Sequence, residues 1–163
     1  MKKFLPAVLL ALLLTGCSAG EASPSLAESA PALTPQEAAQ AVLDAGAFSE
    51  ELEAVDADVA AALYALEPDS IAGTAAYLST GATAEECTFL LAADGEAADA
   101  ALTALQKRVE DQLAALADYQ PGEIAKLEKA LSGSRPVADG TLVYLVVAES
   151  PDAAQAALDG LRK

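Results

Sequence analysis

The chain has many carboxylates, two cysteines and no histidine, and this combination limits the chemistry that it can perform. Of its 163 residues, 25 are Asp or Glu and nine are Lys or Arg. Without histidine the chain can form neither a Ser-His-Asp triad, nor a Cys-His dyad, nor a His-ligated metal site. No spacing among the carboxylates selects a pair for acid–base hydrolysis. The sequence therefore predicts no catalytic residue, and the protein is expected not to be an enzyme.

An acidic cluster is the best candidate for metal binding by oxygen ligands such as those that Ca²⁺ prefers. Its members are Glu50, Glu51, Glu53, Asp56 and Asp58. They lack the Gly and terminal Glu spacing of an EF-hand loop, so a solvated face is favoured and no metal site is predicted. The net charge of −16 also opposes nucleic acid binding, because phosphate contacts need clustered Lys and Arg.

Cys87 is the thiol that could act as a nucleophile. It lies in an apolar stretch beside Glu85 and Glu86. A reactive thiolate needs a neighbouring cation or base, and two carboxylates are the opposite environment. Cys87 is therefore predicted to be a small buried hydrophobic residue.

The first 17 residues have the pattern of an export signal. Lys2 and Lys3 precede an apolar run over residues 4–14, which is too short to span a membrane as a mature helix. The following Leu-Thr-Gly-Cys, at residues 14–17, resembles the bacterial lipobox. That resemblance implies a lipoprotein signal peptide over residues 1–16 and a lipidated N-terminus at Cys17. The alternatives are a plain secretory signal with an incidental cysteine, or a short membrane anchor.

Lipidation would place the protein on the extracytoplasmic side of the cell membrane. Cys17 would carry a covalent diacylglycerol with fatty acids such as palmitate, and whether its amine is acylated too is left open. Two acyl chains give stable anchoring, where one chain is marginal. No other cofactor is expected. Cys87 would then have no intramolecular disulfide partner.

Composition divides the mature chain into a tether and one domain. Residues 17–33 are small and polar, with two prolines, and are predicted to be a lipidated, flexible tether. Residues 34–163 are predicted to form a single domain. Thr34-Pro35-Gln36-Glu37 opens it with a helix capping box.

The hydrophobic periods predict five helices and three strands. A helix over about residues 56–66 is expected to bury Val59, Leu63 and Leu66. Strands are predicted at residues 71–79, 84–92 and 141–148, and residues 132–136 are predicted to be a loop. The expected helices are residues 34–46, 56–66, 96–118, 121–131 and 151–161.

These elements predict an α+β fold in the order ααββααβα. We expect a small antiparallel sheet of about three strands, packed with helices on its faces. The alternative is a sheet with only one covered face. In the strand over residues 84–92, Cys87 and Phe89 should point to one face, and Glu86 and Thr88 to the other.

Three stretches together resemble an uncharacterised bacterial lipoprotein family, domain of unknown function 4358. They are Tyr-Leu-Ser-Thr-Gly-Ala-Thr-Ala-Glu-Glu at 77–86, Lys-Arg-Val-Glu-Asp-Gln at 107–112 and Tyr-Gln-Pro at 119–121. The resemblance would cover about residues 35–160. It supplies no established activity, and it suggests a place among cell-envelope assembly or acylation systems. Its motif positions fall on Glu86, Arg108, Tyr119 and Pro121, whereas Cys87 replaces an expected aliphatic residue.

Glu86 and Arg108 allow two interpretations. They could form a charge-assisted bidentate pair that fixes a helix to the sheet, which is the favoured interpretation. Alternatively, Arg108 could bind a carboxylate or phosphate of a ligand or partner. Tyr119 is expected to pack at a helix junction.

The predicted function is that of a non-catalytic, membrane-tethered interaction or accessory module that binds an envelope protein. The alternative is a small-ligand-binding lipoprotein associated with a transporter, and an envelope-modifying enzyme is the third hypothesis. An exposed apolar patch would favour a protein partner, whereas an enclosed pocket around Arg108 would favour a small ligand.

Overall fold

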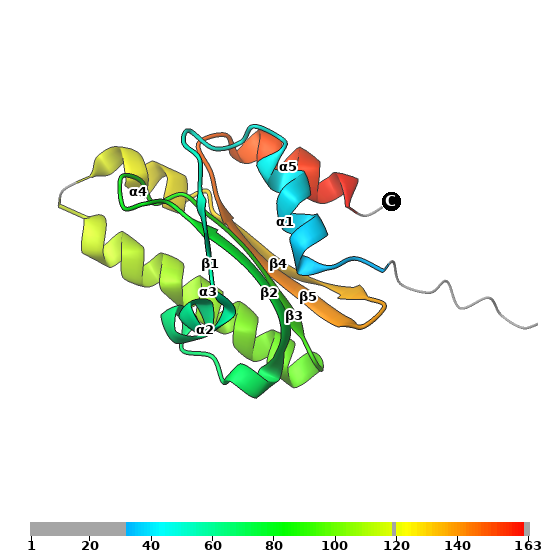
Figure 1. The fold of residues 1–163 in the computed structure, drawn as a ribbon. Coiled ribbons are helices and arrows are strands. Elements are labelled where there is room, and N and C mark those ends of the chain that lie inside the picture. The colour runs from blue at the N-terminus through cyan, green and yellow to red at the C-terminus, as the bar shows by residue number, and fades with distance from the viewer. Residues whose placement is uncertain (1–31, 119, 162–163) are drawn as a thin grey trace, which may run out of the picture.

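The computed structural model describes residues 32–118 and 120–161. They form a five-stranded antiparallel sheet in the strand order β1-β2-β3-β5-β4, with helices on both faces (Figure 1). In chain order the elements are α1 (Pro35–Leu43), β1 (Glu53–Val55), α2 (Ala57–Tyr64), the 3₁₀ helix η1 (Pro68–Ser70), β2 (Ile71–Leu78), β3 (Glu86–Ala92), α3 (Gly95–Leu116), α4 (Pro121–Leu127), β4 (Leu131–Val137), β5 (Gly140–Val147) and α5 (Pro151–Gly160).

The prediction of about three strands in the order ααββααβα is wrong. The three predicted strands correspond to β2, β3 and β5, but the sheet has an additional strand at each edge. β1 lies between the first two predicted helices, where no strand was predicted, and β4 lies where a loop was predicted. Edge strands pair on one side only and keep partly exposed side chains, so they need no strong hydrophobic alternation.

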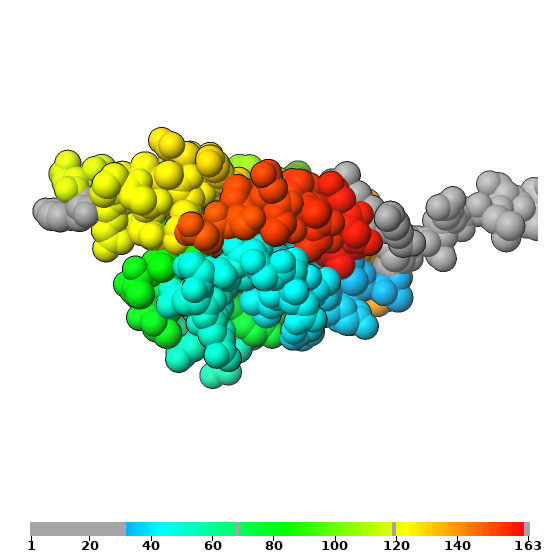
Figure 2. Space-filling view, turned by 90° about the horizontal axis from the view of Figure 1, so that it is seen from above, coloured from blue at the N-terminus to red at the C-terminus, as the bar shows by residue number. Residues whose placement is uncertain are grey.

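The two faces of the sheet carry separate hydrophobic cores. On one face α1 and α5 cover Cys87 and Phe89 of β3, and on the other face α2, α3 and α4 cover Leu90. β3 is therefore buried on both sides, and its side chains alternate as predicted. The alternative of a single covered face is also wrong. Figure 2 shows α5 lying against α1 and against the segment that follows α1.

The start of the domain is fixed by local hydrogen bonds. The backbone N–H of Glu37 donates to the Thr34 hydroxyl at 3.2 Å, and the Thr34 N–H donates to the Glu37 carboxylate at 3.0 Å. These two bonds are the predicted capping box, and they satisfy N–H groups that the first turn of a helix leaves free.

Helix α2 faces the sheet with a different side from the one that its sequence predicted. It buries Ala60 and Tyr64, whereas Val59 and Leu63 are 52% and 38% exposed. The rotation brings the Tyr64 hydroxyl to polar groups on β3, described below, which a Leu or Val side chain could not bind. As a result, two large apolar side chains lie at the surface.

Candidate functional site

Glu86 carries a deeply buried charge on the α2–α3 side of the sheet. It begins β3, and its side chain is 1% exposed. The Nε of Arg108, on α3, donates to Glu86 Oε2 at 2.7 Å, so the structure brings the two predicted residues together. The contact has one hydrogen bond and is not bidentate, because Glu86 Oε1 accepts from Tyr64 instead.

Tyr64 and Thr88 complete this cluster. The Tyr64 hydroxyl lies 2.7 Å from Glu86 Oε1 and 2.7 Å from the Thr88 hydroxyl, and the Arg108 guanidinium lies over the tyrosine ring, 5.9 Å from its centroid. Burial, and then the nearby Glu86 charge, raise the pKa of Tyr64, so its hydroxyl stays protonated and can donate. Glu86, Arg108, Tyr64 and Thr88 are called the Glu86 cluster below. They join α2, β3 and α3.

A groove runs beside this cluster, between α2–η1 and α3. It consists of two adjoining cavities of about 420 and 630 Å³, which share Ala65, Glu96, Ala100 and Ala104. We call it the α2–α3 groove. Arg108 lines the larger cavity, so the Glu86 cluster lies at one end of the groove.

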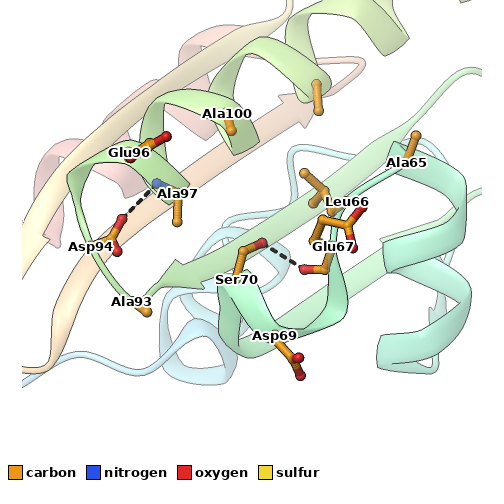
Figure 3. Close-up of a pocket in the computed structure, with 11 residues that line it drawn as sticks. Ala65, Leu66, Glu67, Asp69, Ser70, Ala93, Asp94, Glu96, Ala97 and Ala100 are labelled. Carbon is orange, nitrogen blue, oxygen red and sulfur yellow. Dashed lines mark hydrogen bonds between the residues drawn. The ribbon is translucent and has the colours of Figure 1, made fainter.

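The smaller cavity has an apolar floor and an acidic rim. Figure 3 shows its two walls, with residues of α3 on one side and the segment around η1 on the other. Ala93, Ala97 and Ala100 offer only methyl groups on the α3 side. The four charged residues of its lining are all acidic: Glu67, Asp69, Asp94 and Glu96.

Part of the Arg108 guanidinium makes no hydrogen bond to the residues that the structure describes. Its Nε is the only nitrogen of the group that hydrogen-bonds to a residue in the described ranges. A guanidinium has five N–H donors in a planar fork, so further donors remain for an oxygen that enters the groove. Arg108 thus both fixes α3 to the sheet and contributes to the groove, and the two interpretations of this residue do not exclude each other.

A second charged network, which the sequence did not reveal, holds the loop before β3 to α4 and to the segment after α1. Glu85 is buried, and its carboxylate accepts from the Ser49 hydroxyl at 2.7 Å, the Ser49 N–H at 2.9 Å and Lys126 Nζ at 3.0 Å. Lys126 also reaches Glu149 at 2.8 Å and Glu123 at 3.3 Å. Its sequence signal was the adjacent pair Glu85-Glu86, of which Glu86 begins β3 and Glu85 ends the preceding loop.

The charge of Lys126 is stabilised by its neighbours. Burial alone would lower its pKa, but the hydrogen bonds to Glu149, Glu85 and Glu123 outweigh burial and raise the pKa above its usual value. Lys126 therefore acts as a cationic centre that joins α4 to the sheet, and not as a base.

The remaining predicted residues are placed as follows. Cys87 is buried, and burial followed by the Glu86 charge raises the pKa of its thiol. Pro121 is the first residue of α4. Cys17 and Tyr119 lie outside the described residues. Among residues 32–118 and 120–161, no group of His, Cys, Asp and Glu could hold a metal ion.

In that same part of the chain, every helix is too short or too polar to cross a membrane.

Comparison with curated proteins and with solved structures gives no match. The sequence profile of one family matches residues 44–148. The match is shorter than the expected 35–160, but it contains the sheet, the Glu86 cluster and the α2–α3 groove. Helices α1 and α5 lie outside it. The chain belongs to the family described as Domain of unknown function (DUF4358).

Proposed function

We propose that the protein is a membrane-anchored extracytoplasmic lipoprotein and a non-catalytic accessory module, which binds an envelope protein through its α2–α3 groove. The observation that carries this proposal is the groove itself, an apolar-floored surface with Arg108 at one end. Val59 and Leu63 are exposed on the adjoining helix α2. Exposed apolar surface next to a concave groove is typical of protein interaction sites.

The anchor is supported by the sequence at residues 1–17. The cationic start, the apolar run and the Leu-Thr-Gly-Cys motif together favour attachment of a diacylglycerol to Cys17. The net charge of −16 would not hold the protein on anionic lipid, so the acyl chains must supply the membrane affinity.

The non-catalytic role is supported by the state of the reactive groups that the structure describes. The Cys87 thiol is buried with a raised pKa, which disfavours the thiolate that a nucleophile requires. Glu85 and Glu86, the buried carboxylates, are both held in ion pairs. The oxygens of both carboxylates are therefore already engaged by protein groups.

In-cell crosslinking tests the proposal. A photoreactive amino acid at position 100 lies in the groove, and the same amino acid at position 114 lies on α3 outside both cavities. We expect position 100 to capture a defined envelope protein, identified by mass spectrometry, and position 114 not to capture it. If the two positions give the same products, the groove is not the binding surface.

A small anionic ligand is a second candidate for the groove, and the unused donors of Arg108 favour it. The cavity of about 630 Å³ lies within the size range of ligand sites. In the photocrosslinking experiment, this case would give lipid or small-molecule adducts at position 100 and no protein adduct. Absence of any captured protein in intact cells would therefore contradict the interaction module.

A further inference from the structure

The α2–α3 groove carries a strong imbalance of charge. Its cationic lining residues are already paired: Lys107 binds Asp111 at 2.7 Å, and Arg108 binds Glu86 at 2.7 Å. Apart from Asp111, which pairs with Lys107, the other charged lining residues are acidic, and none of them forms an ion pair with a cation in the described part of the chain: Glu67, Asp69, Asp94, Glu96 and Asp99. The groove is therefore anionic along its rim.

We propose that the occupant of this groove is a cationic amphipathic peptide segment of the partner protein, with Lys or Arg on one side and small apolar residues on the other. The inference rests on the proposed function and adds the chemistry of the partner. Electrostatic complementarity of this kind steers encounter and selects partners.

The apolar side of the bound segment should contact the floor of the groove. Ala97, Ala100 and Ala104 on α3 present methyl groups, so the main chain of a bound segment can approach closely. Leu63 and Leu66 on the other wall provide larger apolar contacts. An amphipathic segment in an apolar groove is a recurring mode of peptide recognition.

The polar groups give the segment a preferred direction. Four of the five carboxylates that have no ion pair line the smaller cavity, and one of them, Asp94, also accepts a hydrogen bond from the Ala97 N–H at 2.8 Å, whereas the Arg108 end offers N–H donors. The cationic part of the segment should lie over Asp94 and Glu96, and its terminal carbonyl or carboxylate oxygens should face Arg108. The distance along α3 from Asp94 to Arg108 is about 21 Å, which matches about 14 helical residues.

Other occupants fit the charges less well. Anionic lipid and nucleic acid would be repelled by the rim. A second copy of the chain would bring a net charge of −16 to an already acidic surface. A free polyamine would match the charge of the rim, but it would gain no binding free energy from apolar contact with the alanines of the floor.

The test uses the full chain, purified in detergent, and fluorescent 14-residue peptides measured by anisotropy. The first peptide has Lys at its N-terminal half and Ala and Leu on the opposite side. The second peptide has Glu in place of Lys, and the third has the residue order of the first reversed. We expect the first peptide to bind at least about tenfold more tightly than the other two. Its affinity should be lower at 300 mM salt than at 50 mM salt, because salt screens the charges. Equal binding of the first and second peptides would overturn the proposal, and equal binding of the first and third would remove the preferred direction.

Variants of the chain locate the binding. Glu96→Lys reverses a charge on the rim, and Ala100→Trp fills the floor of the groove. Each variant should therefore lower the affinity for the first peptide about fivefold or more. Glu128→Lys at the C-cap of α4 and Ala114→Trp on α3 lie outside the groove and serve as matched controls, which should leave the affinity for the first peptide unchanged. If Glu96→Lys has no larger effect than Glu128→Lys, the peptide does not bind in the groove and the proposal fails. Competition by spermine with the same potency as the peptide would also contradict it.

The two proposals fail in different ways. If position 100 crosslinks to an envelope protein while no cationic peptide binds, the accessory function stands and the chemistry inferred for the partner is wrong. If the peptide binds but no protein is captured in cells, the groove recognises cationic segments, and the proposed function is wrong.

Discussion

At the residue scale, the Glu86 carboxylate depends on groups from three elements. It is 1% exposed, and it accepts hydrogen bonds from Arg108 on α3 and from Tyr64 on α2. Removing a charged side chain from water costs several kcal/mol unless it is paired and hydrogen-bonded. The same contacts that make this charge tolerable therefore also hold α2 and α3 against the sheet.

We expect Arg108→Ala to lower the free energy of unfolding by about 2 kcal/mol or more, because it leaves a buried carboxylate without its cation. This loss of stability is smaller than the loss expected for a fully buried ion pair, because the Arg108 side chain is 21% exposed. Urea denaturation followed by circular dichroism measures the change.

The control is Lys107→Ala, which breaks the exposed pair with Asp111 on the same helix. Surface pairs contribute little, so this variant should change stability by about 0.5 kcal/mol or less. If Arg108→Ala is as stable as Lys107→Ala, the ion pair does not fix α3 to the sheet.

Cys87 gives a second prediction at this scale. Burial, and then the Glu86 charge, raise the pKa of its thiol, so the thiolate is scarce at pH 8. We expect iodoacetamide to alkylate Cys87 more than about a hundredfold more slowly than the exposed cysteine of a Val59→Cys variant, since each unit of pKa is a tenfold change in thiolate.

Mass spectrometry of timed samples measures both rates, and 8 M urea should remove the protection of Cys87. Rapid labelling of Cys87 in the native protein would mean that the thiol is accessible and reactive.

The site was predictable from sequence only in part. The pair of Glu86 and Arg108 could be selected, because the resemblance to the family implied motif positions at both residues. Tyr64 and Lys126 were missed, since nothing local shows that a helical tyrosine or lysine faces a buried carboxylate. Such partners are far apart in the chain, and only the fold brings them together.

At the element scale, the middle strands were predictable and the edges were not. β3 and β5 have long apolar runs, which indicate burial on both faces. β4 reads Leu-Ser-Gly-Ser-Arg-Pro-Val, a composition typical of a loop. It is a strand because it pairs with β5. In this pairing Gly133 is opposite Tyr144, and a Cβ on the glycine would lie 2.7 Å from the tyrosine oxygen.

The hairpin between β4 and β5 depends on Gly140. Its φ is +149°, and a Cβ at this position would clash with the carbonyl oxygen of Ala92. We expect Gly140→Ala to lower the free energy of unfolding by about 2 kcal/mol or more, because a side chain adds both backbone strain and a steric clash. The urea midpoint measures this loss.

Gly122→Ala is the matched control, since Gly122 lies in α4 and a Cβ there would meet nothing within 4 Å. Alanine favours helix over glycine, so this variant should be neutral or more stable by up to about 1 kcal/mol. Equal midpoints for the two variants would contradict the role assigned to Gly140.

At the scale of the whole molecule, the acidity and the proposed anchor would have separate roles. The net charge of −16 keeps the domain away from anionic lipid, while the rim of the α2–α3 groove concentrates part of that charge at one surface. A protein of this charge gains no electrostatic attraction to anionic lipid, and Cys17 is the residue proposed to carry a hydrophobic attachment.

We therefore expect Cys17→Ala to abolish a mass increase equal to a diacylglycerol and to move the mature-size protein from the detergent phase to the aqueous phase in phase partitioning. Cys87→Ala is the matched control, because it removes the other cysteine and leaves the lipobox intact. Only mature-size protein is compared, since a precursor that keeps its apolar run would associate with membranes by itself. Two acyl chains supply enough hydrophobic surface for stable attachment, so the difference between the two variants should be nearly complete. If mature Cys17→Ala protein still enters the detergent phase, some other part of the chain holds it at the membrane, and the anchor proposed at Cys17 is wrong.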